Sequence, residues 1–146
     1  MLRRFACIVA GILLPMASFS ASAADVGRIK LASGAVHIER AGQRVPAPVD
    51  AGIQASDTVV TGPNGAVGIT FNDNTRISAG PGSTLVINRY AFDPGTHAGA
   101  LDATLKRGTL AAVTGRLARQ SPEAVTIRTP TLILGVRGTE FVVSAE

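Results

Sequence analysis

Histidine and cysteine are the residue types that would first reveal a metal site, and this sequence holds few of them. Its one cysteine is Cys7, and its two histidines, His37 and His97, lie far apart in the sequence. Zinc sites in proteins use closely spaced groups of such residues. His37 alternates with Val36 and Ile38, a pattern typical of a strand residue that faces solvent. We therefore expect no metal site and no cofactor.

Catalytic motifs are equally sparse. No G-x-S-x-G nucleophile turn occurs, and Asp50 and Asp57 lie near turn-forming Gly or Ser, where aspartate usually supports the turn. Gly80-Pro81-Gly82-Ser83 resembles a phosphate-binding loop, but no helical pattern follows to align backbone amides. A carbohydrate platform needs flat aromatic faces, and the chain has no Trp and one Tyr. The sequence predicts a protein that is not an enzyme, and an enzyme acting on the cell envelope remains the weakest of three hypotheses.

Short apolar stretches with a period of two dominate the sequence after residue 24, and turn-forming residues separate them. In Val67-Gly68-Ile69-Thr70-Phe71 large apolar side chains alternate with Gly and Thr, as in a half-buried strand. Asn72-Asp73-Asn74 and Pro63-Asn64-Gly65 predict turns on either side of it. The predicted strands are 27–31, 35–39, 58–61, 67–71, 75–78, 84–88, 101–106, 109–113, 125–128, 132–136 and 140–143.

About ten short strands around one core predict an all-β fold of two facing, mainly antiparallel sheets, as a sandwich or roll. A short β-solenoid is the alternative, although no repeat of fixed length occurs. Residues 89–99 form the longest predicted loop, and residues 115–123 form a second irregular segment. Because loops on a rigid scaffold concentrate binding residues, Tyr90, Phe92 and His97 are the candidate contacts for a ligand or partner.

The first residues predict an export signal. Arg3 and Arg4 precede an uncharged apolar run over residues 5–19, and Ala21-Ser22-Ala23 fits a cleavage site. The apolar run is shorter than a membrane-spanning helix requires. We expect residues 1–24 to be a cleaved signal peptide and residues 25–146 to form one domain in the periplasm of a Gram-negative bacterium. No membrane span is predicted after signal cleavage.

The charge of the expected mature chain argues against nucleic acid as a partner. The full sequence has 14 basic and 10 acidic residues, so loss of Arg3 and Arg4 leaves 12 against 10, a net charge of +2. Such a balance does not build a dense basic face. The remaining length of about 120 residues suffices for one core but not for two.

The C-terminal segment carries a family resemblance. Thr129-Pro130-Thr131-Leu132-Ile133-Leu134-Gly135-Val136-Arg137-Gly138-Thr139-Glu140-Phe141-Val142-Val143 resembles the signature of the FecR domain family, and upstream segments follow the order of strands and turns in that family. These upstream segments are Gly34-Ala35-Val36, Asp57-Thr58-Val59-Val60-Thr61-Gly62 with Gly65, Phe71-Asn72-Asp73-Asn74-Thr75-Arg76-Ile77 and Leu105-Lys106-Arg107-Gly108-Thr109-Leu110.

The residues of the resemblance are expected to serve mainly the architecture of the domain. Gly135 and Gly138 flank Arg137 in a strand-like run, which predicts a bulge or a close backbone approach there. The signature residues are Gly62, Gly65, Asp73, Gly108, Gly135, Arg137, Gly138, Thr139 and Phe141.

What the resemblance implies is an extracytoplasmic all-β domain, best known as the periplasmic half of anti-sigma regulators that sense iron-siderophore uptake. This sequence shows neither the anti-sigma segment nor the transmembrane helix of those regulators, so we expect no direct control of a sigma factor. Glu146 follows soon after Phe141-Val142-Val143, which predicts an unpaired strand edge open to a partner or to self-association.

These observations order the functional hypotheses. The leading hypothesis is a non-enzymatic periplasmic interaction or sensor module, with a role in signalling, that binds an unidentified protein or cell-envelope component. The second hypothesis is a periplasmic protein that binds a small ligand.

Overall fold

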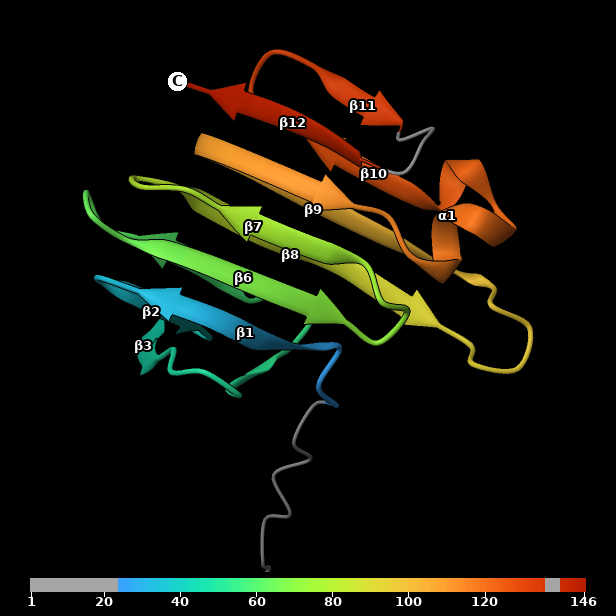
Figure 1. The fold of residues 1–146 in the computed structure, drawn as a ribbon, viewed down its shortest axis with the longest axis horizontal. Helices are drawn as coiled ribbons and strands as arrows, with labels where there is room; N and C mark the ends of the chain where they lie inside the picture. The colour runs from blue at the N-terminus through green and yellow to red at the C-terminus, as the bar shows by residue number, and fades with distance from the viewer. Residues whose placement is uncertain (1–23, 136–139) are drawn as a thin grey trace, which may run out of the picture.

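The computed structural model describes residues 24–135 and 140–146, and their fold is all-β, as predicted (Figure 1). One short α-helix, α1 (Arg116–Gln120), and one 3₁₀ turn, η1 (Pro122–Ala124), accompany the strands. The strands are β1 (Gly27–Ser33), β2 (Val36–Arg40), β3 (Gln43–Pro46), β4 (Gly52–Ile53), β5 (Thr58–Thr61), β6 (Ala66–Phe71), β7 (Arg76–Ala79), β8 (Thr84–Phe92), β9 (Gly99–Val113), β10 (Val125–Arg128), β11 (Ile133–Gly135) and β12 (Glu140–Ala145).

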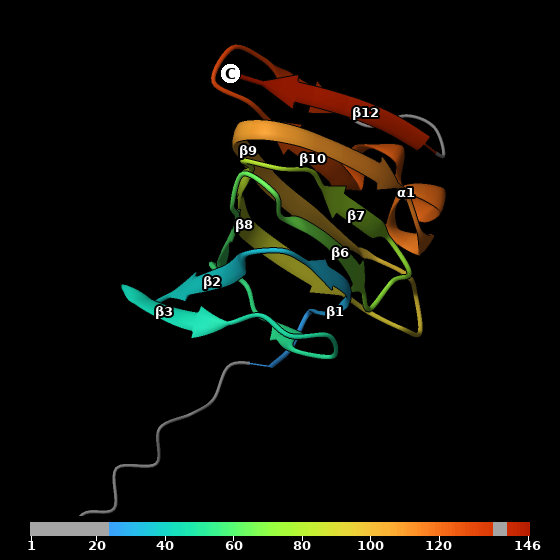
Figure 2. The same cartoon turned by 60° about the vertical axis from the view of Figure 1, so that its left-hand side comes forward.

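The strands form one curled, open sheet, and the prediction of two separate facing sheets is not confirmed. The main path runs β3-β2-β5-β8-β9-β7-β6-β1-β4, and Figure 2 shows how this path curls around its inner face. The long strand β9 joins the two halves. Its first part pairs with β8 and, in parallel, with β10, whereas its last part pairs with β7 and β12.

A glycine at the bend of β9 explains why one strand replaces the two that were predicted over residues 101–106 and 109–113. Gly108 has a φ of 97°, in the region that L side chains rarely adopt. A Cβ added there would lie 2.5 Å from the Cα of Ser83. The glycine therefore lets β9 change direction against the start of β8 without ending the strand.

The predicted alternation of apolar and polar residues is confirmed in the core. Strand β6 buries Val67, Ile69 and Phe71 on one face, and β7 buries Ile77 and Ala79. The largest fully buried side chains come from both halves of the sheet, so the curl encloses one core rather than two. They are Phe71, Ile29, Ile38, Ile53, Ile69, Ile77, Leu85, Ile87, Leu101, Leu105, Leu110 and Leu117.

Several local predictions need correction. The β-solenoid alternative is wrong for the described residues, because their strand pairs are antiparallel except for β9 with β10. Strands β3 and β4 were not predicted, because each is too short to show a clear alternating pattern. Each pairs with one other strand. The loop predicted over residues 89–99 is only the turn 93–98, because β8 extends through Phe92. The irregular segment 115–123 contains α1, which has Leu117 buried against the core.

No helix among the described residues is long and apolar enough to span a bilayer.

Candidate functional site

Asp73 organises one end of the sheet. Its side chain is fully buried in the turn between β6 and β7. It accepts hydrogen bonds from the Thr75 hydroxyl at 2.6 Å, the Thr75 amide at 3.2 Å, the Tyr90 hydroxyl at 3.0 Å and the Leu117 amide at 3.2 Å. Its backbone carbonyl accepts from the Arg116 amide at 2.8 Å. One carboxylate therefore connects the β6–β7 turn to β8 and to α1.

Gly115 allows α1 to approach this turn. A Cβ at Gly115 would lie 2.5 Å from the Thr75 amide nitrogen and in contact with the Asp73 carbonyl oxygen. The Gly115 amide donates a hydrogen bond of 3.0 Å to the Thr75 hydroxyl oxygen. The position of α1 on the end of the sheet is thus set by hydrogen bonds to buried groups and by the missing side chain.

Tyr90 belongs to the same network and is not free to contact a ligand with its hydroxyl group. That hydroxyl donates to the Asp73 carboxylate and accepts from the Asp73 amide at 2.9 Å. The ring stacks on Phe71, with centroids 5.3 Å apart. Burial, followed by the nearby charge of Asp73, raises the pKa of Tyr90 well above its ordinary value of 10.0.

A polar depression of about 460 Å³ lies beside this network. It is lined by Arg76 at the start of β7, Arg116 and Arg119 of α1, Thr70 and Asn74, together with residues 113–115 that follow β9. We call it the arginine depression. Its arginines were not among the candidate contact residues from the sequence. Arg76 and Arg116 are distant in the chain and come to line one depression only when α1 folds against the β6–β7 turn.

The other predicted contact residues lie in the β8–β9 connection. Phe92 stacks on His97 with ring centroids 5.9 Å apart, and His97 has a φ of 58°. Asp93 holds the turn by accepting from the Gly95 amide at 2.8 Å. Phe92 and His97 are therefore neighbours, whereas Tyr90 points into the core and does not join them.

Gly62 and Gly65 lie in the turn before β6 at the opposite end of the molecule from Asp73. The Gly62 amide donates to the Ala35 carbonyl at 2.8 Å, and the Gly65 amide donates to the Gly62 carbonyl at 2.9 Å. A Cβ at Gly65 would contact the Ala35 carbonyl oxygen. These glycines pack the turn between β5 and β6 against the turn between β1 and β2.

The C-terminal signature lies partly outside the described residues, which exclude Arg137, Gly138 and Thr139. Gly135 ends β11, and a Cβ there would meet nothing within 4 Å, so the expected close backbone approach is not found at this glycine. Phe141 of β12 packs against the core. Within the described ranges β12 pairs only with β9, and its other edge has no strand partner there.

Two arginine–carboxylate pairs lie elsewhere among the described residues, Arg40 with Asp57 and Arg128 with Asp102. Asp57, 1% exposed, binds the Arg40 guanidinium through contacts of 2.7 and 2.9 Å and accepts from the Gln54 amide. The Asp57 hydrogen bond raises the pKa of Arg40, and this pair ties β2 to the start of β5. Over residues 24–135 and 140–146, no group of three or more His, Cys, Asp or Glu side chains could hold a metal ion.

Comparison with known proteins identifies the family. The family model described as FecR protein matches residues 57–146, which include β5 to β12 and most of the residues discussed above. Comparisons with curated proteins and with solved structures found no match. The matched region covers more than half of the sequence and contains Asp73, Gly108 and the C-terminal signature, and we conclude that this chain belongs to the FecR family.

Proposed function

We propose that this protein is an exported, non-enzymatic interaction module of the periplasm that binds a protein partner in signal transduction. Membership of the FecR family carries the proposal, because FecR domains occur in signal-transduction regulators and are generally non-enzymatic. The signal-peptide pattern of residues 1–24 supports export. The module acts by offering a surface of its sheet to the partner.

The open edge of β12 is the surface that best suits such a partner. Exposed strand edges present unpaired backbone groups to which another chain can add a strand. Val142 of β12 is 67% exposed and Ile133 of β11 is 64% exposed, so apolar side chains accompany these edges. An added strand would gain backbone hydrogen bonds from β12 and apolar contacts from Val142.

In-cell crosslinking of the tagged protein tests this function. We expect one dominant periplasmic or membrane protein to be captured, and Val142→Lys to reduce its yield about tenfold, because a charged edge side chain opposes strand addition. Leu31→Lys is the matched control. Leu31 is a 56% exposed apolar residue on β1, which pairs with β4 and β6 away from β12.

The outcomes separate the alternatives. Equal capture by the wild type and by both variants would place the partner elsewhere than β12. Self-crosslinks alone, abolished by Val142→Lys, would replace the partner with a second copy of this chain. Absence of any specific crosslink would refute an interaction module.

The small-ligand hypothesis is favoured by a different observation from the one expected. The Tyr90 hydroxyl is engaged with Asp73, whereas Phe92 and His97 remain candidate contacts in the β8–β9 connection. The arginine depression is the feature that suggests a ligand, and its chemistry is developed below.

A further inference from the structure

The arginine depression gathers three cations on a rigid frame. Arg76 pairs with Thr70 of β6 and with Val113 of β9 in the strand register, so these three residues lie side by side across the sheet. Arg116 and Arg119 approach from α1, whose backbone is held by hydrogen bonds to Asp73. The positions of the three arginine backbones relative to one another are therefore set before any ligand arrives.

The three guanidinium groups have no anionic partner among the described residues. The ion pairs found there join Lys30 to Asp50, His37 to Glu39, Arg40 to Asp57 and Arg128 to Asp102. Arg76, Arg116 and Arg119 form no side-chain hydrogen bond within the described ranges either. Arg44 and Arg107 also lack such a partner among the described residues, but Arg76, Arg116 and Arg119 are the ones that share the depression.

The buried carboxylate beside the depression is already hydrogen-bonded. Asp73 lies behind Gly115 with its oxygens occupied by donors from Thr75, Tyr90 and Leu117. It positions α1 but presents no oxygen to the depression. Three like charges that share one concavity repel one another, and an anion bound between them would remove that repulsion.

We propose that the arginine depression binds a small ligand through a phosphate or diphosphate group. Guanidinium groups bind phosphate oxygens through paired, charge-assisted hydrogen bonds. A phosphate monoester carries close to two charges and three acceptor oxygens, which suits a depression lined by three arginines better than a single carboxylate does. A volume of about 460 Å³ exceeds the size of inorganic phosphate and leaves room for a second phosphate or a sugar. Asn74 and Thr70 supply further polar groups for that part of the ligand.

Calorimetric titration of the purified protein with pyrophosphate tests the site. We expect saturable binding that weakens as salt is raised, because the attraction is between exposed charges. Removal of guanidinium groups in the double variant Arg76→Gln/Arg119→Gln should weaken binding about tenfold per arginine, the contribution expected of a charged hydrogen bond.

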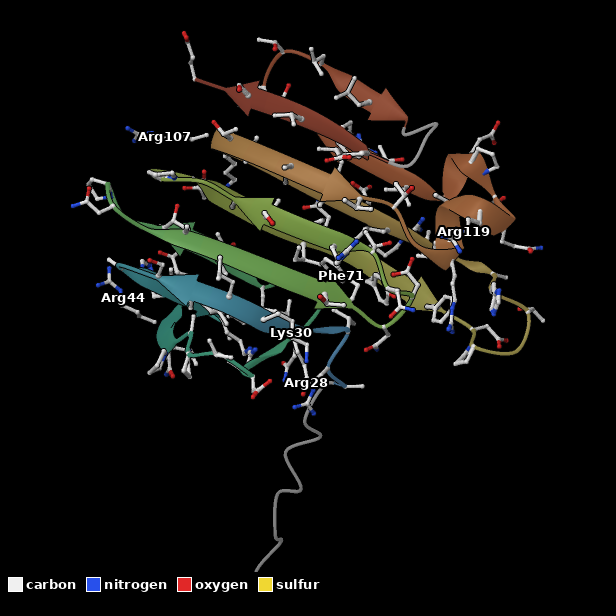
Figure 3. The ribbon with its side chains drawn as sticks, in the orientation of Figure 1. Arg28, Lys30, Arg44, Phe71, Arg107 and Arg119 are labelled. Carbon is white, nitrogen blue, oxygen red and sulfur yellow. The ribbon has the colours of Figure 1, made fainter. Side chains whose placement is uncertain are left out.

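The double variant Arg44→Gln/Arg107→Gln is the matched control. Both residues are exposed and the change in net charge is the same, yet Figure 3 shows Arg44 and Arg107 away from the end of the sheet where Arg119 lies. This control should bind pyrophosphate within about twofold of the wild type, because distant exposed charges are screened. Circular dichroism of both variants checks that the sheet is retained.

Two further experiments identify the source of the phosphate group and test whether the site prefers phosphate to carboxylate. Sedimentation with phosphatidylcholine vesicles that contain phosphatidic acid, lost in Arg76→Gln/Arg119→Gln, would assign the group to a lipid headgroup. Pyrophosphate binding without such sedimentation would assign it to a soluble molecule. Succinate that binds as tightly as pyrophosphate would overturn the choice of phosphate.

The proposal fails if neither pyrophosphate nor the phosphatidic acid vesicles bind, or if the two double variants weaken binding equally. It does not depend on the protein partner, because it uses the arginines of β7 and α1 and not the outer edge of β12. Crosslinking through β12 should be unchanged in Arg76→Gln/Arg119→Gln, so the two ideas can fail separately.

Discussion

Asp73 shows how much of this molecule depends on single side chains. A fully buried carboxylate is costly unless its oxygens are hydrogen-bonded, and here four donors surround it. The donors come from its own turn, from β8 and from α1. The same residue therefore closes the β6–β7 hairpin and places the two arginines of α1.

Asp73→Asn should lower the free energy of unfolding by about 2 kcal/mol, because an amide group turns a donor toward donors that are buried. Urea denaturation measures the change. Asp93→Asn is the matched control: Asp93 is exposed and accepts from the Gly95 amide through one oxygen, which asparagine retains. The control should change stability by less than about 0.5 kcal/mol. Equal effects of the two substitutions would contradict the role given to Asp73.

At the scale of elements, β9 decides the architecture. It pairs with β8, β10, β7 and β12, so both halves of the sheet depend on it. The bend at Gly108 divides these pairings, with β8 and β10 before it and β7 and β12 from there to Val113. A straight strand of this length could not pair with strands in both halves of the curled sheet.

Gly108→Ala should destabilise the protein by about 3 kcal/mol. The added methyl group combines a strained positive φ with an overlap against Ser83, and each effect costs about 1–3 kcal/mol. Gly42→Ala separates the two effects, because Gly42 has a φ of 76° and open space around it. That control should cost only about 1 kcal/mol. A Gly108→Ala protein as stable as Gly42→Ala would show that β9 can bend without close contact to β8.

The whole molecule has one core to which residues outside the FecR match contribute. Ile29, Ile38 and Ile53 belong to β1, β2 and β4, precede residue 57, and are at most 1% exposed. Phe71 of β6 stacks on Tyr90 of β8, so the two halves of the curled sheet meet at that aromatic pair. Loosening of either half should therefore expose Tyr90.

The ionisation and absorbance of Tyr90 can be followed without interference, because it is the only tyrosine and the chain has no tryptophan. They therefore measure whether the two halves of the sheet stay packed together. Its pKa in the folded protein lies above the ordinary value of 10.0. Its stabilising contribution is thus complete below pH about 10, and is lost as the pH rises above that value, since the unfolded state releases its proton first. Titration followed by phenolate absorbance should show ionisation that coincides with loss of the circular dichroism signal. Ionisation near pH 10 in a protein with an intact sheet would contradict the burial and hydrogen bonding described here.

The sequence by itself determined the strand-rich class, the family and most strand positions. These features follow from period-two burial and from turn residues such as Asn72-Asp73-Asn74, and both act over a few neighbouring residues. The short strands β3 and β4 escaped prediction because they lack a long alternating pattern.

Only the tertiary structure decided how the strands join and which charged side chains meet. The continuity of β9 depends on the fit of Gly108 against Ser83, a contact between residues far apart in the chain. Arg76 and Arg119 share a depression because Asp73 and Gly115 hold α1 on the end of the sheet. Such arrangements depend on long-range packing and hydrogen bonding, for which local periodicity carries no signal.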